Sequence, residues 1–378
     1  MRDAPRAWVD RLLASPRFRA WAARFPLTRP IARRRARALF DLTAGFVYSQ
    51  VLLACVRLDL FRILADGPQT GAALARRFAL SPEASARLLE AAVSLRLVAR
   101  RRGGRFGLGP LGAAMVGNDA VAAMIAHHPM LYGDLADPVA LLRGERGATE
   151  LGRYWAYARA ERPSDLDAAR VADYSALMAA SQPLVAAEGL DASRIDRHRC
   201  LLDMGGGDGV FLQAAAARAP RLRLMLFDLP AVADRARARC AAAGLAERAT
   251  AIGGDVFADS PPRGADIVSL VRVIHDHEDA RAVAILRAAR RALSAGGALL
   301  LAEPMAGTRG AEPIGAAYFA FYLLAMGSGR ARTPAELAAL LRTAGFGPPR
   351  LLPTATPLLT RLMIAQPSSD GRSPVSHA

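Results

Sequence analysis

The sequence predicts an α/β protein: a doubly wound, mostly parallel sheet of seven strands, preceded by a mainly helical region that contains a winged helix. Two observations predict this. From residue 199 onward, short apolar strands alternate with helical segments, as in a parallel sheet with helices on both faces. Between residues 51 and 115, three helical segments precede a hairpin. The 378 residues suffice for about two domains.

The first 40 residues form a basic amphipathic arm. They hold eleven arginines against two aspartates, so +9 of the net charge of +16 lies here. Aromatic side chains recur among the arginines at roughly helical spacing, at Trp8, Phe18, Trp21 and Phe25. A helix of this kind can lie on an anionic membrane surface. A solvated basic helix and a nucleic-acid contact are the alternatives.

The composition excludes several kinds of chemistry. All 50 basic residues are arginine, and the absence of lysine excludes a Walker A phosphate loop and a lysine Schiff base. Three cysteines, at 55, 200 and 240, fit no disulfide or zinc pattern. The longest apolar stretch, residues 45–56, is shorter than a membrane span. We expect a cytoplasmic protein, with peripheral contact to the inner membrane left open.

Residues 41–118 contain the winged helix. Thr70 introduces a short helix, and Ser81 caps a longer one that has Pro82 at its first position. Two short strands then flank Gly103 and Gly104. Arginines 100, 101, 102 and 105 on this hairpin allow a nucleic-acid-binding regulator as an alternative. The helix at 81–98 carries little positive charge, so we expect it to pack against another helix and to bind no nucleic acid.

Residues 119–198 read as a helical connector that contributes to an acceptor pocket, and residues 199–367 as the sheet domain. Its strands are expected at 200–204, 223–228, 249–255, 266–273 and 298–304, with helices at 209–219, 231–244 and 279–294. Two late runs, 349–355 and 361–366, add edge strands, one of them antiparallel. Residues 368–378 are expected to be a disordered tail.

The loop after the first of these strands, "DMGGGDG", is the first candidate binding feature. Gly205, Gly207 and Gly209 let the backbone approach a ligand, and ligands of open α/β sheets lie beyond the carboxyl ends of the strands. Asp228 ends the second strand, where a carboxylate can accept both hydroxyls of a ribose. Asp255 ends the third strand, where a carboxylate can bind an adenine amino group. The alternative for Asp228 is a helix cap.

Several motifs together resemble a known family. "LLDMGGGDG", "LMLFDLP", "GGDVF", "IHDHED", "LLLAEP" and "GRARTPAELAALLRTAGF" are similar to those of class I S-adenosylmethionine-dependent O-methyltransferases of the plant caffeic-acid and bacterial small-molecule type. The resemblance covers essentially the whole chain. It implies S-adenosyl-L-methionine as cofactor, S-adenosyl-L-homocysteine as product, a winged-helix dimerisation domain and a homodimer. The cofactor-binding residues it implies are Asp203, Gly205, Gly207, Gly209, Asp228, Leu229, Asp255, Val256, Phe257 and Arg272.

The resemblance also assigns the catalytic residues. Relatives carry His-Asp-Trp-Ser-Asp, whose first histidine is the general base; here this is His275, followed by Asp276. Glu303 matches the acid that orients the base. A neutral imidazole with a fixed tautomer suits the removal of a hydroxyl proton. One departure weakens strong activation of the base, because Ala331 replaces a second glutamate of the relatives.

A metal site is the rival interpretation of "IHDHED". His275 and His277 with nearby acids could bind zinc or iron, but no third cluster of histidine or cysteine stands at ligand spacing. His127 and His128 could join them only through folding. We expect no metal. A catalytically silent cofactor-binding protein is a further alternative, against which the intact His275 and Glu303 argue.

"FDLTAGFVYSQVLLACVRLDLF" and "LYGDLADPVALL" narrow the resemblance to the bacterial carotenoid methyltransferases of the hydroxyneurosporene and demethylspheroidene type, which act on 1-hydroxycarotenoids. A lipophilic acceptor follows, and the basic arm suits it. A phenolic or polyketide acceptor is the alternative. Methionines and aromatics at helical spacing are usually core residues, but some should line the acceptor pocket. The candidates are Met124, Met130, Tyr132, Tyr174, Met178, Phe319, Tyr322 and Met326.

Overall fold

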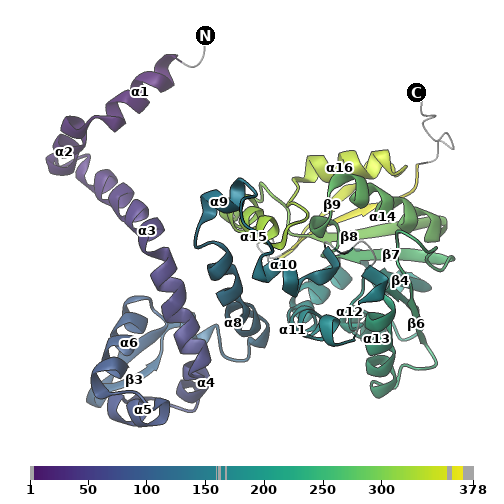
Figure 1. Cartoon of the computed structure of the whole chain (residues 1–378), viewed down its shortest axis with the longest axis horizontal. Helices are drawn as coiled ribbons and strands as arrows, with labels where there is room; N and C mark the ends of the chain where they lie inside the picture. Colours follow the sequence, from purple (N-terminus) through teal and green to yellow (C-terminus); the bar gives the residue numbers. More distant parts are fainter. Residues whose placement is uncertain (1–3, 159, 161–162, 167, 356–359, 369–378) are drawn as a thin grey trace. The chain divides into compact units, whose positions relative to one another are not determined.

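The computed structural model describes residues 4–158, 160, 163–166, 168–355 and 360–368. The chain divides into two compact units, Met1–Asn118 and Asp119–Ala378, each described here by itself (Figure 1). Almost all of the expected disordered tail lies outside the described residues.

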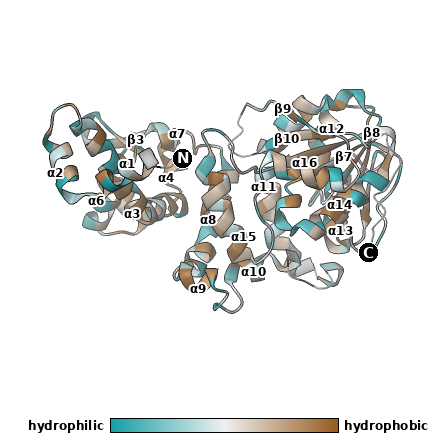
Figure 2. Ribbon diagram, turned by 90° about the horizontal axis from the view of Figure 1, so that it is seen from above, coloured by the Kyte–Doolittle hydropathy of each residue, from teal (hydrophilic) through white to brown (hydrophobic). Residues whose placement is uncertain are grey.

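The first unit begins with three helices, α1 (Ala4–Ala14), α2 (Pro16–Arg24) and α3 (Arg29–Arg57). The side chain of Ser15 caps α2 by accepting from the amide of Phe18. Of the described helices, α3 alone is long and apolar enough to cross a membrane, a statement that rests on length and composition. Its apolar residues are coloured brown in Figure 2. Several of them are exposed: Leu39, Phe40, Leu42, Phe46 and Val47.

The winged helix follows α3 as expected. It comprises α4 (Leu60–Ala65), β1 (Gln69–Thr70), α5 (Gly71–Phe78), α6 (Pro82–Ser94), β2 (Val98–Arg101), β3 (Arg105–Leu108) and α7 (Pro110–Ala113). Thr70 and Ser81 cap α5 and α6 by accepting backbone amides. The hairpin turns at Gly103 and Gly104, which both have positive φ. The strand β1, which the sequence did not predict, pairs with β3 and completes a sheet of order β1-β3-β2.

Helices open the second unit: α8 (Asp119–Asp134), α9 (Pro138–Leu142), α10 (Glu150–Tyr154) and the long α11 (Ala168–Ser193), with short 3-10 turns η2 (Ala156–Ala158), η3 (Pro163–Asp165) and η4 (Ile195–Arg197). The buried carboxylate of Asp134 joins α8 to α10, because its oxygens accept the amides of Glu150 at 2.9 Å and Leu151 at 2.8 Å. Two of the free amides at the N-terminus of α10 are thereby hydrogen-bonded.

The seven-stranded sheet is confirmed. Its order is β6-β5-β4-β7-β8-β10-β9, and β4 to β8 run parallel while β10 is antiparallel to β8. The strands are β4 (Cys200–Met204), β5 (Arg223–Asp228), β6 (Ala249–Gly253), β7 (Ala265–Val271), β8 (Leu293–Glu303), β9 (Arg350–Leu352) and β10 (Arg361–Ala365).

Helices cover both faces of this sheet, which gives two buried apolar layers. One layer packs α14 (Asp279–Ala292) and α16 (Pro334–Thr343) on the sheet. The other packs α11, α12 (Val210–Arg218) and α13 (Pro230–Ala242). The remaining elements are η5 (Ile274–Asp276), η6 (Ile314–Tyr318) and α15 (Phe319–Met326). Because the parallel strands share one carboxyl edge, the acids that end β4, β5 and β8 are brought to the same side of the unit.

Candidate active site

The glycine loop between β4 and α12 is tied to the acid at the end of β5. The amide of Gly207 donates to Oδ2 of Asp228 at 2.8 Å, and the amide of Leu229 donates to Oδ1 at 2.7 Å. Gly207 has φ +57, and nothing lies within 4 Å of a Cβ placed there, so the backbone faces open space. Burial raises the pKa of Asp228 to about 6, although the two amides act to lower it.

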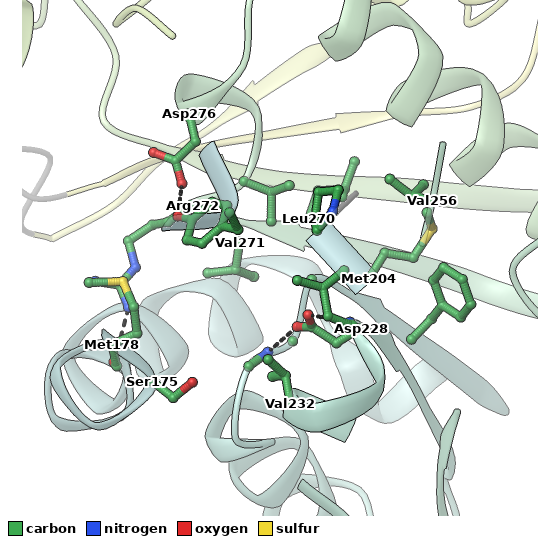
Figure 3. A pocket seen from close by; sticks show the side chains of 18 of the residues that line it. Ser175, Met178, Met204, Asp228, Val232, Val256, Leu270, Val271, Arg272 and Asp276 are labelled. Carbon is green, nitrogen blue, oxygen red and sulfur yellow. Dashed lines mark hydrogen bonds between the residues drawn. The ribbon is translucent and has the colours of Figure 1, made fainter. Parts of the chain in front are cut away.

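A cavity of about 170 Å³ lies over this loop. Figure 3 shows Asp276, Arg272 and Met178 along one side of it and Asp228, Met204 and Val256 along the other. At its β6 end the amide of Phe257 donates to Asp255 at 2.9 Å. The predicted cofactor residues that line it are Gly205, Gly207, Asp228, Leu229, Asp255, Val256, Phe257 and Arg272.

Two of the predicted cofactor residues, Asp203 and Gly209, flank the glycine loop but do not line the cavity. Asp203 is wholly buried, and its Oδ1 accepts the hydroxyl of Ser269 at 2.6 Å. Burial raises the pKa of Asp203 to about 7. Gly209 adopts φ +77 at the start of α12. Both residues shape the loop, which is a structural contribution to the cavity.

Glu303, at the end of β8, holds the turn that carries His275. One of its oxygens accepts the amides of Val273 at 3.0 Å and Ile274 at 2.7 Å. The other lies 2.6 Å from Nδ1 of His275. The side chain of Glu303 is 2 % exposed. A buried carboxylate with these partners fixes Nδ1 as the protonated nitrogen of the ring and leaves Nε2 for chemistry.

A second carboxylate stands at that other nitrogen. Oδ1 of Asp276 lies 3.1 Å from Nε2 of His275. Burial alone would lower the pKa of His275, but Asp276 and Glu303 together raise it above its usual value. Although Ala331 stands where the relatives have a second glutamate, His275 still contacts two carboxylates, Glu303 at Nδ1 and Asp276 at Nε2.

His277 occupies a different environment. It lines the cavity over the glycine loop, whereas His275 lines a second cavity. Burial lowers the pKa of His277 to about 4, so the ring is neutral at ordinary pH. Its ring stacks edge-on with Phe257 at 5.7 Å. Among the described residues no group of three His, Cys, Asp or Glu side chains is placed to hold a metal ion.

The second cavity, of about 130 Å³, is bounded by α8, η2, α11, η5 and α15. After the roles that the sequence predicts for their lining residues, we name it the acceptor cavity, and the cavity over the glycine loop the cofactor cavity. The predicted acceptor residues Met124, Met178, Phe319, Tyr322 and Met326 line the acceptor cavity, and Tyr174 lines the cofactor cavity. Met130 and Tyr132 are not among the lining residues of either.

The two cavities share a wall. Tyr157, Met178, Arg272 and Asp276 line both of them. Arg272 donates to Ser181 Oγ at 2.7 Å and to the carbonyl oxygen of Met178 at 3.2 Å, and it also bonds Gln182. Burial lowers the pKa of Arg272 to about 10, which leaves it charged at neutral pH. These four side chains therefore face both cavities.

His127 and His128 belong to a hydrogen-bond network beside the acceptor cavity. Nε2 of His127 lies 2.9 Å from the hydroxyl of Tyr322, which accepts from Trp155 Nε1 at 2.8 Å. Nε2 of His128 lies 2.9 Å from the hydroxyl of Tyr318. Burial lowers the pKa of both histidines. The two histidines therefore fix the orientation of Tyr318 and Tyr322 in the cavity wall. Among the described residues they do not form a metal-binding group with His275.

The sequence interpretation missed a group that clamps the His275 turn. Arg332 donates to the carbonyl oxygens of Ile274 at 2.9 Å and His277 at 2.6 Å, and to Asp279 at 2.7 Å. Gly329 has φ +82, and a Cβ there would lie 2.1 Å from the carbonyl oxygen of His275. Both residues stand in the quoted "GRART" segment, so the signal was present, but the partners 50 to 60 positions away could not be read from it.

Tyr157, Ser175 and Thr360 were also missed. The Tyr157 hydroxyl donates to Asp276 Oδ2 at 2.7 Å. The hydroxyls of Ser175 and Thr360 are buried without a partner among the described residues, and they line the cofactor and acceptor cavities respectively. Isolated serine, threonine and tyrosine residues in helical or loop segments carry no motif, so no sequence pattern could have selected them.

Comparison with known proteins gives one consistent family. The O-methyltransferase domain family model matches residues 132–347, and the O-methyltransferase dimerisation domain matches residues 40–118. The chain is 44% identical to the demethylspheroidene O-methyltransferase of Cereibacter sphaeroides, over 95% of this chain and 94% of that protein. It is 40% identical to the corresponding protein of Rhodobacter capsulatus, over 95% and 89%.

Solved structures agree with the fold. The crystal structure of LaPhzM superposes with a TM-score of 0.71 at 28% identity, covering 88% of this chain and 99% of that one. Human N-acetylserotonin methyltransferase in complex with SAM superposes with a TM-score of 0.71 at 24% identity, over 89% and 98%. With the family model covering more than half of the chain and two relatives of near full-length similarity, the chain belongs to the S-adenosylmethionine-dependent O-methyltransferases.

Proposed function

We propose that this enzyme methylates the tertiary 1-hydroxyl of an acyclic carotenoid, in carotenoid biosynthesis. The observation that carries the proposal is the 44% identity, over nearly the whole of both chains, to a protein named demethylspheroidene O-methyltransferase. Relatives that bear phenazine or acetylserotonin names are 30% and 34% identical and cover less of the chain. A phenolic or polyketide acceptor is therefore the second candidate.

The cofactor cavity suits S-adenosylmethionine. Open space beside Gly207 admits a ligand against the loop, and Asp228 offers two carboxylate oxygens for ribose hydroxyls. Asp255 and Phe257 would bind the adenine, and the unpartnered Nε of Arg272 and hydroxyl of Ser175 would meet polar groups of the methionine end. When bound, the cofactor supplies a methyl group on a sulfonium sulfur. We propose that no metal takes part.

His275 is placed to take the acceptor's proton. It lines the acceptor cavity, Glu303 holds its Nδ1–H, and Asp276 stabilises the positive charge that the ring gains when Nε2 receives the hydroxyl proton. Met178, Arg272 and Asp276 would hold the acceptor oxygen in line with the methyl group across the shared wall. Because a tertiary alcohol is a weak acid, its proton would pass to Nε2 of His275 as the oxygen–methyl bond forms and the methyl–sulfur bond breaks.

The acceptor cavity is apolar and small. Its apolar lining includes Met124, Phe319, Tyr322 and Met326, its polar lining includes His275, Arg272 and Asp276, and its volume is about 130 Å³. A carotenoid polyene is far larger than this cavity, so only its hydroxylated end would enter and the polyene would extend outward. An enzyme for such an acceptor must collect it from a membrane, where it is dissolved.

The basic arm suits this task. Trp8, Trp21 and Phe25 are 62%, 50% and 39% exposed, and the rings of Trp21 and Phe25 stack at 5.0 Å among arginines. Residues 1–39 also precede the matched dimerisation domain. We assign 1–40 to membrane contact, 41–118 to a homodimer interface, 119–198 to the acceptor pocket and 199–367 to cofactor binding. Each basic residue near an anionic surface contributes about 1 kcal/mol.

Two assays test the proposal. The purified protein with labelled S-adenosylmethionine is offered a hydroxycarotenoid in anionic liposomes and a panel of phenols; methylation of phenols alone would refute the acceptor. A variant lacking residues 1–28, which removes α1 and α2 but leaves α3 whole, should bind these liposomes more weakly and turn over embedded carotenoid more slowly. Unchanged binding and turnover would refute the membrane role. Neutral liposomes serve as the control.

A further inference from the structure

We propose that Tyr157 is a positioning residue for the base, acting through Asp276. The proposal rests on the function proposed above, in which His275 takes the acceptor's proton. No motif assigns a role to Tyr157, which lies in the 3-10 turn η2 directly after the buried Trp155.

The geometry forms a chain of three side chains. The Tyr157 hydroxyl donates to Oδ2 of Asp276 at 2.7 Å, while Oδ1 of the same carboxylate lies 3.1 Å from Nε2 of His275. Among the residues that the structure describes, each carboxylate oxygen of Asp276 therefore has one side-chain partner. A carboxylate held at one oxygen cannot rotate its other oxygen away from the imidazole without losing a charge-assisted hydrogen bond.

Tyr157 is itself fixed and keeps its proton. Its ring lies 6.0 Å from Trp155 and 5.2 Å from Tyr174, which packs it into the wall between the cavities. Burial, reinforced by the charge of Asp276, raises the pKa of Tyr157 well above its usual value. The hydroxyl is therefore a donor at every pH at which the enzyme would work, and a neutral donor beside a carboxylate does not compete for the hydroxyl proton of the acceptor.

The hydrogen bonds of Arg272, a cation that interacts electrostatically with this carboxylate, go to other partners. The positive charge of Arg272 is attracted by the carboxylates of Asp276 and Glu303. Its hydrogen bonds, however, go to Ser181, Gln182 and the carbonyl oxygen of Met178, all on α11. Within the described part of the chain, four groups face His275: Glu303 from β8, Asp276 and Arg272 from its own segment, and the ring of Phe319 from α15. Tyr157 donates to one of them, Asp276, and thereby determines the orientation of that carboxylate.

Loss of the hydroxyl would leave Oδ2 of Asp276 without this donor, so the carboxylate could rotate toward the positive charge of Arg272. Oδ1 would then leave Nε2 of His275, and the imidazole would lose one of the two carboxylates that raise its pKa. The base becomes weaker and less well oriented, whereas Asp228, Asp255 and the glycine loop at the other side of the cofactor cavity stay in place. The expected signature is a fall in kcat and in the pKa of His275, with little change in cofactor affinity.

The test compares Tyr157→Phe with Tyr154→Phe. Tyr154 is three residues earlier, its hydroxyl donates to the carbonyl of Asp173 at 2.9 Å, and it lines neither cavity. Tyr157→Phe should lower kcat on the hydroxycarotenoid by about ten-fold to a hundred-fold, the effect of one hydrogen bond to a charged group. Tyr154→Phe should leave kcat unchanged. Thermal melting of both variants checks that they fold.

A double-mutant cycle separates positioning from a direct role. If Tyr157 acts through Asp276, then Tyr157→Phe combined with Asp276→Asn should be no slower than Asp276→Asn alone. Multiplying losses, or a Tyr157→Phe variant as active as the parent, would overturn the proposal.

One readout does not depend on the acceptor. NMR titration of His275 in the free protein should show a lower pKa in Tyr157→Phe than in the parent, and an unchanged titration would overturn the positioning role. If the parent methylates no hydroxycarotenoid but the pKa of His275 is lower in Tyr157→Phe, the proposed acceptor is refuted and the role of Tyr157 stands.

Discussion

The guanidinium of Arg332 donates to the carbonyl oxygen of Ile274 at 2.9 Å, so a residue 58 positions further along the chain holds the backbone next to His275. The same guanidinium reaches the carbonyl of His277 and the carboxylate of Asp279. A planar fork with five donors can satisfy three partners at once, and an ammonium group cannot reproduce this geometry.

Arg332→Lys should therefore lower kcat by about ten-fold while cofactor affinity changes little, because the turn that carries His275 loosens. Arg330→Lys is the matched control, since Arg330 forms exposed ion pairs with Asp279 and Glu336. Steady-state kinetics of the two variants checks the expectation. Equal effects would show that charge near Asp279, rather than the clamp, is what matters.

His275→Ala should reduce turnover by about 10²–10⁴-fold, the usual range for loss of a general base. His277→Ala should be mild, because His277 is a neutral ring on the wall of the cofactor cavity. Single-turnover rates with saturating cofactor measure both. Equal losses from the two variants, or activity lost on dialysis against a chelator, would instead favour the metal interpretation.

The pH dependence of turnover follows from the raised pKa of His275. The base must be neutral to accept a proton, so activity should be absent at low pH and rise as the pH passes through that pKa. The rising limb should therefore lie above the ordinary imidazole value of about 6.5. Asp276→Asn should move the limb to lower pH and lower the plateau. A parent profile that rises below pH 6 would contradict the two-carboxylate arrangement.

Cofactor binding should be sensitive to the glycine loop and to the acid of β5. Gly207→Leu places a side chain in the cofactor cavity at a residue with φ +57, and Asp228→Ala removes the expected ribose contact. Calorimetry with S-adenosylhomocysteine should show clearly weaker binding for both. Gly310→Ala, at a position with open space outside both cavities, controls for the strain of a positive φ. Parent-like affinity in either test variant would remove its residue from the binding site.

The homodimer should depend on the exposed apolar face of α3. Phe46 is 70% exposed and lies in the matched dimerisation domain, so Phe46→Glu places a charge where we expect a partner helix. Light scattering should report a dimer for the parent and a monomer for the variant. Leu142→Glu, on α9 of the second unit, is the control. A parent that is monomeric would remove this role from α3.

Much of the second unit could be predicted because its signals are local. The glycines after β4, the acid that ends β5 and the helix expected at 279–294, observed as α14, are each specified by neighbouring residues. The short strand β1 was not predictable, since two residues at Gln69 acquire strand geometry only by pairing with Phe106. Local pattern determines where an element begins, but not what a distant residue adds to it.

The site shows the same division. His275 and Glu303 were identified through a resemblance, and the structure brings them to 2.6 Å. Tyr157 and Arg332 reach the same turn from positions 119 and 58 residues away from their partners. Met130 and Tyr132 are of the same residue types as the lining residues, but they line neither cavity. Helical periodicity alone does not show which face of α8 a cavity will meet, so the sequence could not separate them from Met124.

The two cavities are lined mainly by different elements, and this division has an evolutionary consequence. The cofactor cavity is built mainly from loops at the ends of the parallel strands, whereas the acceptor cavity draws Met124 from α8 and Phe319, Tyr322 and Met326 from α15. Substitutions in α8 and α15 can therefore reshape the acceptor cavity while the donor half of the enzyme is left intact. After gene duplication, substitutions on α8 and α15 could change which alcohol or phenol is accepted while the residues that bind the methyl donor stay the same.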